Sequence, residues 1–306
     1  TPGFAYFSDS MRNSLAGDNG NSLGFASGAG NGGSMVSEWM ANPRWSKNPQ
    51  QVIQYVSCHD NYTLADKLII STKASGVNSD IIKMNNLAAA FYMTAQGVPF
   101  IHAGEELLRE KINSDGSRNH NSYNSPDSVN KIDWTDLEKY ADNVEYYKGL
   151  IAFRKAHPAL RMTTADAVAA NITVIEGLAN KATAFQFAAN ANGDSAEGIY
   201  VIFNPANEAL DVTLPEGNWD IYVNGEDAGT EILGSATGTV QQLRSVAVNG
   251  FWGTESGLGS LDAVKELMRR NNLTTEADNL TVGMALAATQ AAIWEFAALD
   301  QMIFCK

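Results

Sequence analysis

The stretch that decides the fold is Val52-Ile-Gln-Tyr-Val-Ser-Cys-His-Asp-Asn61. A run of apolar and β-branched residues ends abruptly in an imidazole, a carboxylate and an amide. This pattern is typical of a buried parallel strand that carries polar side chains to the open end of a barrel. We therefore expect a site at His59, Asp60 and Asn61, although a His-Asp pair on its own is more often a solvated loop element.

The same arrangement recurs about forty residues later. Val98 to His102 is an apolar strand followed by the charged pair Glu105 and Glu106. Between the two strands, Ser79 is suited to cap a long helix over Asp80 to Gln96. A strand, a helix and a strand at this interval predict a βαβ unit, so that polar groups at both strand ends face the same side.

An aromatic-rich strand is also predicted upstream, at Phe4 to Phe7, with a short helix over Ser10 to Leu15. Asp9 lies where this strand ends. We interpret it as a cap or first-turn acid of the helix rather than as a catalytic group. The Gly-, Asn- and Ser-rich segment Gly17 to Gly33 is expected to form a long surface loop over the mouth of the barrel.

The segment from Arg109 to Trp134 is polar and loop-like. Its density of hydrogen-bonding groups, together with Tyr123, suits a hydroxyl-rich ligand, since sugars require many donors and acceptors and flat aromatic faces. An ordinary solvated loop explains the composition equally well. A helix over Asp142 to His157 follows and is ended by Pro158.

The character of the chain changes at about His157 to Thr164, where helical period gives way to strand period. An antiparallel β-sandwich is predicted after this point, with Asn224-Gly225 as one of its turns. A helical tail is predicted from Phe251 onward, and it includes an apolar helix over Val282 to Phe304. The alternating runs are 172–176, 183–188, 199–203, 210–214, 219–223 and 240–248.

Composition limits the possible partners. The 306 residues carry 21 Lys plus Arg against 34 Asp plus Glu, a net charge of −13. Such an acidic surface repels phosphate backbones, so a nucleic acid partner is not expected. No apolar run is long enough to span a membrane. The two cysteines, Cys58 and Cys305, form neither a disulfide framework nor a zinc-binding pattern, and no metal or cofactor is expected.

Four motifs in order carry a family resemblance. They are Tyr55-Val-Ser-Cys-His-Asp-Asn, Leu64-Ala-Asp-Lys-Leu, Gly97-Val-Pro-Phe-Ile-His-Ala-Gly-Glu-Glu and His120-Asn-Ser-Tyr-Asn-Ser-Pro-Asp-Ser-Val-Asn-Lys-Ile-Asp-Trp. Together they resemble type I pullulanase, a debranching member of the α-amylase superfamily (glycoside hydrolase family 13). The resemblance spans about Phe4 to Val248, and four ordered motifs are far more specific than one.

The resemblance implies an architecture. Residues 1–160 would be the C-terminal part of a (β/α)8 TIM barrel, with the strands at Phe4, Val52 and Val98 as its sixth, seventh and eighth. Residues 161–249 would be the family's β-sandwich C-domain, and residues 250–306 would be the helical tail. The fold class expected is therefore α/β plus all-β.

The resemblance also implies roles for residues. Asp60 would be the third carboxylate, which stabilises the transition state, and His59 would bind the same glucose. Asn61 would be a further substrate-binding residue. Tyr123, Asn124 and Asp127 would lie on a substrate-facing loop, with an α-glucan cleaved at α-1,6 branch points of pullulan, starch or glycogen-derived glucans.

The family's nucleophile and acid/base follow barrel strands four and five, which would precede Thr1. We therefore expect the chain to be inactive without a partner half, whether it derives from a split enzyme or an incomplete product. Glu105 and Glu106 cannot replace the missing pair, because adjacent residues at a strand end point in opposite directions, so a structural role is assigned to them. The alternative is a non-catalytic carbohydrate-binding or surface-attachment protein.

A second resemblance concerns the tail. Thr289-Gln-Ala-Ala-Ile-Trp294 resembles a stretch of the thioester domains of Gram-positive surface adhesins. In those domains the Gln is joined to an earlier Cys, and the only earlier Cys here is Cys58, so a buried helix is the competing interpretation. This likeness leads us to expect an extracellular or cell-surface location.

Overall fold

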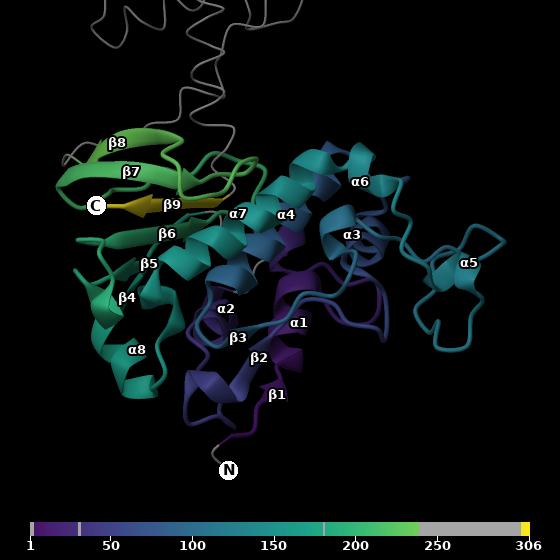
Figure 1. The fold of residues 1–306 in the computed structure, drawn as a ribbon, viewed down its shortest axis with the longest axis horizontal. Coiled ribbons are helices and arrows are strands. Elements are labelled where there is room, and N and C mark those ends of the chain that lie inside the picture. The colour runs from purple at the N-terminus through teal and green to yellow at the C-terminus, as the bar shows by residue number, and fades with distance from the viewer. Residues whose placement is uncertain (1–2, 30–31, 180, 239–300) are drawn as a thin grey trace, which may run out of the picture.

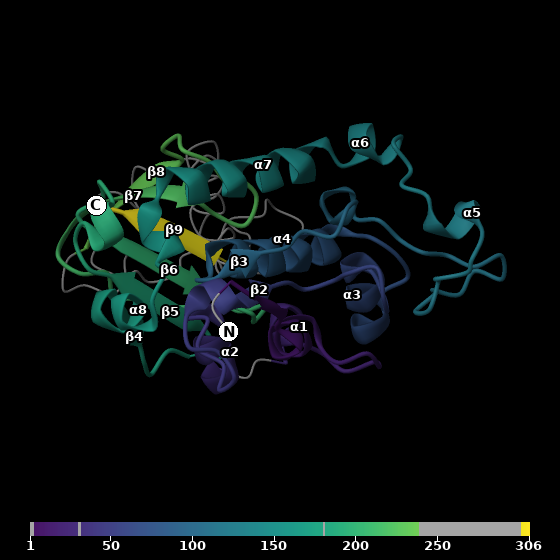
Figure 2. The same ribbon diagram turned by 60° about the horizontal axis from the view of Figure 1, so that its bottom comes forward.

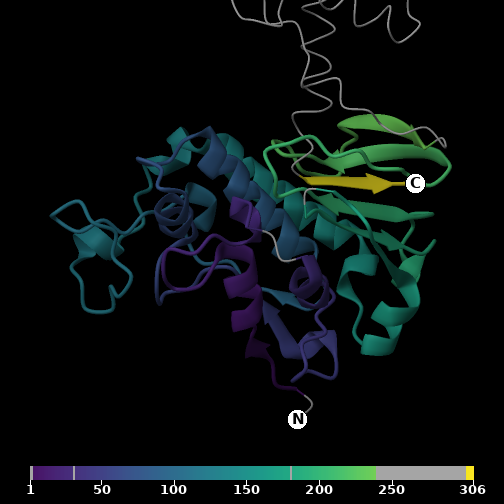
Figure 3. The same ribbon diagram turned by 180° about the vertical axis from the view of Figure 1, so that it is seen from behind.

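The computed structural model describes residues 3–29, 32–179, 181–238 and 301–306. Its described residues form a three-stranded parallel sheet with helices around it and a six-stranded antiparallel sheet. Figures 1 and 3 show the antiparallel sheet on one side of helices α4 and α7, with the parallel strands on another side of the same helices. The expected mixture of α/β and all-β parts is therefore present. The helices are α1 (Asp9–Ala16), α2 (Gly32–Trp39), α3 (Leu64–Thr72), α4 (Ser79–Thr94), α5 (Asp127–Asn130), α6 (Asp136–Lys139), α7 (Ala141–Ala156) and α8 (Ala165–Asn171).

The parallel sheet has the order β1 (Tyr6–Phe7), β2 (Val52–Gln54) and β3 (Val98–Pro99). In register, Tyr6 lies opposite Val52, and Ile53 lies opposite Val98. All three strands therefore end at the same edge, as the sequence predicts. β2 is shorter than the expected strand, because its neighbours provide only two paired residues each and the chain leaves the ladder after Gln54.

Helix starts agree with capping chemistry, with one correction. Ser8 caps α1 by accepting a hydrogen bond from the Met11 amide, so Asp9 is the first-turn acid of that helix. α4 is capped by Asn78, whose side chain accepts from the Ile81 amide. The prediction that Ser79 is the cap is therefore wrong by one residue, since Asn78 holds the extended conformation that a cap requires.

The antiparallel sheet has the order β4-β5-β6-β9-β7-β8. Four of its strands coincide with predicted runs, and β8 was not predicted. Within the described residues the strands form one sheet, and the second layer of a β-sandwich is not among them. The strands are β4 (Ile172–Ile175), β5 (Thr183–Phe187), β6 (Ile199–Phe203), β7 (Gly217–Val223), β8 (Gly234–Gly238) and β9 (Gln301–Cys305).

Strand β9 corrects the predicted tail. The expected helix over Val282 to Phe304 is wrong at its end, because residues 301–305 form a strand between β6 and β7. A short apolar run fits a buried helix and a buried central strand equally well. Here the run forms a strand because it pairs with the edges of both β6 and β7. The rest of the predicted tail, with the run at 240–248 and the Thr289 to Trp294 motif, lies outside the described residues.

The predicted strand at Leu210 to Leu214 is also wrong. Leu210, Val212 and Leu214 are buried against the outer face of the sheet with Tyr200, Trp219 and Phe304, but the segment pairs with no described strand. Its alternating burial is therefore observed without pairing to another described strand. The sequence pattern reports which side chains are buried, and it does not report whether a neighbouring strand is available.

One hydrophobic core joins the helices to the antiparallel sheet. Trp39 of α2 stacks on Phe185 of β5 with ring centroids 3.8 Å apart, and Phe91 of α4 contacts Phe203 of β6 at 4.7 Å. These residues belong to a single cluster of buried side chains. The change of period at His157 to Thr164 thus marks a change of architecture without a break in the core.

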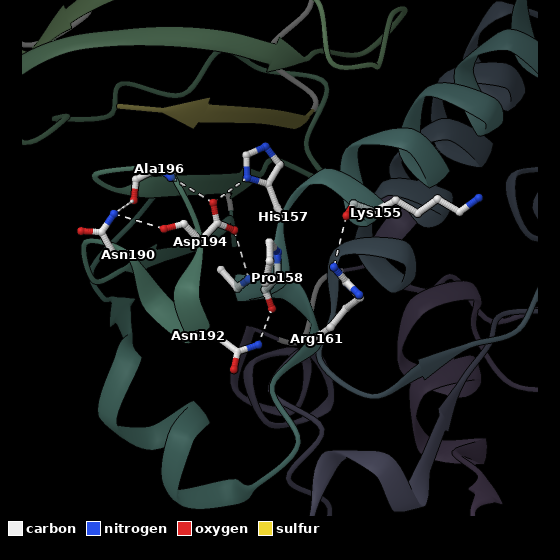
Figure 4. A network of polar contacts seen from close by, with 9 residues as sticks. Lys155, His157, Pro158, Arg161, Asn190, Asn192, Asp194 and Ala196 are labelled. Atoms are coloured by element: carbon white, nitrogen blue, oxygen red, sulfur yellow. Dashed lines mark hydrogen bonds and ion pairs between the residues drawn. The ribbon is translucent and has the colours of Figure 1, made fainter.

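A polar network holds the chain where this change occurs (Figure 4). The Asp194 carboxylate accepts hydrogen bonds from the amides of Ala159 and Ala196, at 3.1 and 3.0 Å. His157, which follows α7, lies 3.1 Å from the same carboxylate. Asn192 donates to the Pro158 carbonyl, at 2.7 Å. The end of α7 is therefore fixed to the loop that precedes β6.

None of the helices in the described residues is long and apolar enough to cross a membrane.

Candidate functional site

The candidate site lies on the loop that follows β2. His59 and Asp60 are exposed, and the His59 Nε2 atom lies 3.3 Å from Asp60 Oδ2. Asn61 has a φ of 63°, a left-handed conformation that Asn tolerates better than most residues. Asp60, Asn61 and Arg12 of α1 line a small cavity of about 20 Å³. Two of the three residues predicted from the central motif therefore line this cavity, and the third, His59, lies beside Asp60.

The beginning of this loop is held by a buried carboxylate. The Ser57 hydroxyl donates to Glu105 Oε2 at 2.7 Å, and the hydroxyls of Tyr92 and Tyr147 donate to Oε1 at 2.7 and 3.2 Å. Desolvation raises the pKa of Glu105 to about 7, against the opposing effect of these three hydroxyl donors. Glu106 is instead partly exposed and accepts a hydrogen bond from the Gly104 amide. The two acids point in different directions, as predicted.

His102 lies beside the same anchor. Its Nδ1 atom is 3.5 Å from the Ser57 hydroxyl, at the outer limit of a hydrogen bond. Desolvation, with the charges of Arg109 and Lys111, lowers the pKa of His102 to about 4. The imidazole is therefore neutral at physiological pH, and it is a polar group without charge next to the loop.

Asp66 of α3 is a second buried carboxylate near the site. Its Oδ2 atom accepts from the Lys111 amide at 2.7 Å and from the Thr63 hydroxyl at 3.0 Å. Its Oδ1 atom lies 3.0 Å from Arg118 Nε. Desolvation raises the pKa of Asp66 to about 6, although the Lys111 amide, the Thr63 hydroxyl and Arg118 oppose that rise. Asp66 belongs to the motif Leu64-Ala-Asp-Lys-Leu, and the sequence alone indicated no role for it.

The structure brings only part of the predicted polar loop to this site. The ring of His120 lies 5.6 Å from the ring of Tyr62, which lines the same cavity, but Tyr123, Asn124 and Asp127 lie elsewhere. Tyr123 and Asn124 are exposed, and Asp127 is the first residue of α5. Figures 1 and 2 show α5 on an arm that projects away from the parallel strands. The arm is held internally, since the Asn130 amide donates to the carbonyls of Ser122 and Ser125. Within the described residues, no hydrogen bond or ion pair joins Tyr123, Asn124 or Asp127 to the His59-Asp60 loop.

The site offers carboxylate, imidazole and amide groups to a polar ligand. Across the described parts of the chain, no three His, Cys, Asp or Glu side chains converge as metal ligands. Cys58 is a half-buried free thiol in the loop, and Cys305 is a buried free thiol in β9. Burial raises the pKa of the Cys305 thiol. The His59-Asp60 pair is the polar group of this loop that is most accessible from solvent, since the two side chains are 85% and 64% exposed.

The chain is similar to several pullulanases. A family model described as the pullulanase all-beta domain matches residues 168–227. The pullulanase of Bacillus subtilis (strain 168) is 33% identical over 223 residues, which are 70% of this chain and 30% of that protein. The isoamylase of a Flavobacterium species is 29% identical over 210 residues, which are 55% of this chain and 26% of that protein.

Solved structures give the same result. The pullulanase from Bacillus acidopullulyticus matches with a TM-score of 0.72 and 38% identity, over 78% of this chain and 29% of that one. The pullulanase from Paenibacillus barengoltzii, solved with maltohexaose and alpha-cyclodextrin, matches with a TM-score of 0.68 and 36% identity, over 74% of this chain and 35% of that one.

The fold and these matches place the chain in glycoside hydrolase family 13. Within this family the chain corresponds to a C-terminal portion of a type I pullulanase. It spans about a third of the length of the relatives that it matches: 30% of the Bacillus subtilis pullulanase and 29% of the Bacillus acidopullulyticus one.

Proposed function

We propose that this chain contributes the last three barrel strands and the sheet domain of an enzyme that hydrolyses α-1,6-glucosidic branch points in pullulan, starch or glycogen-derived glucans. The observation that carries the proposal is the position of His59 and Asp60, directly after the central strand of a parallel sheet. Catalytic groups of TIM-barrel enzymes occupy this end of the strands. Four ordered motifs and the similarity to pullulanases support the same activity.

The finer fold assignment makes β1, β2 and β3 the sixth, seventh and eighth strands of a (β/α)8 barrel. Three strands cannot close a barrel, because closure links strand number, tilt and shear. β1 and β3 each pair on one side only within the described residues. Next to β1, Phe4, Tyr6 and Trp45 are exposed at 59%, 60% and 47%, which is unusual for aromatic residues beside a sheet.

These exposed edges are where the remaining barrel strands would pair. A polypeptide that provides strands one to five would cover the aromatic side chains and supply the nucleophile and the acid/base. Retaining glycosidases hold these two carboxyl groups about 5 Å apart. Neither group is assigned to the described residues, so catalysis requires that second half of the barrel.

Roles within the site follow from the chemistry of the transition state. Asp60 would stabilise the positive charge that develops on the sugar ring, and His59 and Asn61 would bind the hydroxyls of the same glucose. Tyr123, Asn124 and Asp127 are proposed to contact more distant sugars, which requires the α5 arm to face the substrate in the completed barrel. The maltohexaose and alpha-cyclodextrin in the structure of the Paenibacillus barengoltzii pullulanase support an α-glucan as the ligand class.

An extracellular or cell-surface location is part of the same proposal, since pullulan and starch supplied from outside a cell are polymers too large to enter it uncut. Cell fractionation followed by immunoblotting would test it. The alternative of a non-catalytic carbohydrate-binding chain receives no support from the relatives, which bear the names of enzymes.

The experiment is a reducing-sugar assay on pullulan. The purified chain is assayed alone and after co-expression with a pullulanase segment that carries barrel strands one to five. We expect release of maltotriose only from the combined sample, with the α-anomeric configuration retained by NMR. A folded, associated pair of chains that cleaves no α-1,6 linkage would refute the proposal.

A further inference from the structure

The loop that carries His59 and Asp60 is tied to a buried lysine. Lys111 is 2% exposed, and its Nζ atom donates to the main-chain carbonyl of His59 at 2.9 Å. Burial of an ammonium group is costly unless polar groups receive its protons. Here the acceptor is the carbonyl of His59, a residue of the site. If that carbonyl moves away, Lys111 loses the hydrogen bond that compensates for its burial.

Lys111 is itself fixed at its backbone. Its amide donates to Asp66 Oδ2 at 2.7 Å, and its carbonyl accepts from the Asn119 amide at 2.8 Å. Asp66 is completely buried and is held in turn by Thr63 and Arg118. These contacts leave the lysine little freedom except along its side chain, which reaches from this cluster to the site loop.

The charges favour the same arrangement. Desolvation and the neighbouring Arg109 lower the pKa of Lys111, and the carboxylates of Asp66 and Asp60 counteract this effect. The ammonium therefore lies within electrostatic range of both the buried acid and the site acid. No other described cation donates a hydrogen bond to the main chain between Ser57 and Asn61.

We propose that Lys111 is a positioning residue: by binding the His59 carbonyl it sets the backbone of the loop, and so the directions in which the His59 and Asp60 side chains point. This inference rests on the proposed function for its effect on catalysis, while its effect on the loop is independent of activity. A side chain that must bind a distorted sugar has to be held within a fraction of an ångström, which a solvated loop does not achieve alone.

The first test measures the loop without any assay of catalysis. Cys58 is half buried, adjacent to His59, and its Sγ atom lies 3.7 Å from the Asp60 carbonyl. Cys305 is buried in β9, so dithionitrobenzoate reports on Cys58 in the native chain. In Lys111→Met we expect Cys58 to be labelled about ten-fold faster. The reason is that the variant lacks one charged hydrogen bond that restrains the loop in the wild type.

Two further variants separate positioning from general stability. Lys111→Arg keeps a cation that can reach the carbonyl and should label at the wild-type rate. Arg154→Met removes another buried cation, one that binds the carbonyls of Met93, Ala95 and Gly97 away from the site, and should leave labelling of the folded protein unchanged. If Lys111→Met does not fold, Lys111→Gln, whose amide is too short to reach, replaces it.

The second test uses the completed enzyme on pullulan. We expect Lys111→Met to lower kcat about ten-fold with a much smaller change in KM, because a displaced His59-Asp60 pair loses contacts that strengthen in the transition state. Lys111→Arg should restore most of kcat. Wild-type labelling rates in Lys111→Met, or faster labelling with unchanged kcat, would overturn the inference. An inactive wild-type pair would refute the proposed function alone, since the labelling result stands without it.

Discussion

Replacement of Glu105 by Gln should make the chain more stable at alkaline pH relative to the wild type. The Glu105 carboxyl is fully enclosed, and its partners are three neutral hydroxyls with no cation among them. Burial raises its pKa from the ordinary 4.5 to about 7. A glutamine has the same shape and no charge, and the hydroxyls of Ser57, Tyr92 and Tyr147 can each accept as well as donate hydrogen bonds.

The size of the effect follows from linkage. Because the folded-state pKa lies above the unfolded value, the folded protein binds more protons than the unfolded chain between these two values. The stability that Glu105 contributes is complete below about pH 4.5 and is lost as the pH rises through 7. A difference of one between the folded and unfolded pKa values corresponds to about 1.4 kcal/mol, so the wild type should lose about 3 kcal/mol across the pH range that spans both values.

Urea unfolding followed by tryptophan fluorescence at pH 5, 6, 7 and 8 measures this difference. The free energy of unfolding of Glu105→Gln, relative to wild type, should rise by about 3 kcal/mol from the acid to the alkaline end. Asp66, whose pKa is also raised, is present in both proteins and cancels in the comparison. The partly exposed neighbour provides the control Glu106→Gln, which should parallel the wild type. A difference between Glu105→Gln and wild type that does not vary with pH would refute the reasoning.

Three other changes test the site and the core. Asp60→Asn in the completed enzyme should lower kcat on pullulan by two orders of magnitude or more, for a loss of about 3 kcal/mol of transition-state binding, and near-normal turnover would contradict its role. Trp39→Ala should cost about 3–5 kcal/mol in urea unfolding, because it removes a buried stack, whereas Trp134→Ala, at a 68% exposed position, should change stability by less than about 0.5 kcal/mol. Gly149→Ala should destabilise α7 despite the higher helix propensity of alanine, since the added Cβ would lie 1.8 Å from the Ala228 carbonyl oxygen. The control Gly76→Ala adds a Cβ that meets nothing within 4 Å, so it should be neutral or slightly stabilising. Equal melting temperatures for these two variants would disprove the clash.

Much of the architecture followed from the sequence alone. Apolar runs at Val52 and Val98, separated by helical segments, sufficed to predict a parallel βαβ arrangement. Since parallel strands end at a common edge, the polar residues His59 and Asp60 could also be assigned to that edge. Local patterns determine these features, because hydrophobic period and capping act over a few residues.

Other features depended on contacts between distant segments. The sequence shows that residues 301–305 are apolar, but only the open edges of β6 and β7 decide that they form a strand. Adjacent acids such as Glu105 and Glu106 look alike in the sequence, and the surrounding hydroxyls alone distinguish the buried one. Likewise, nothing near Lys111 in sequence indicates that its ammonium binds the His59 carbonyl. Burial and hydrogen-bond partners are properties of the folded packing, since they are set by residues far apart along the chain, and a local pattern contains no information about which distant groups will meet.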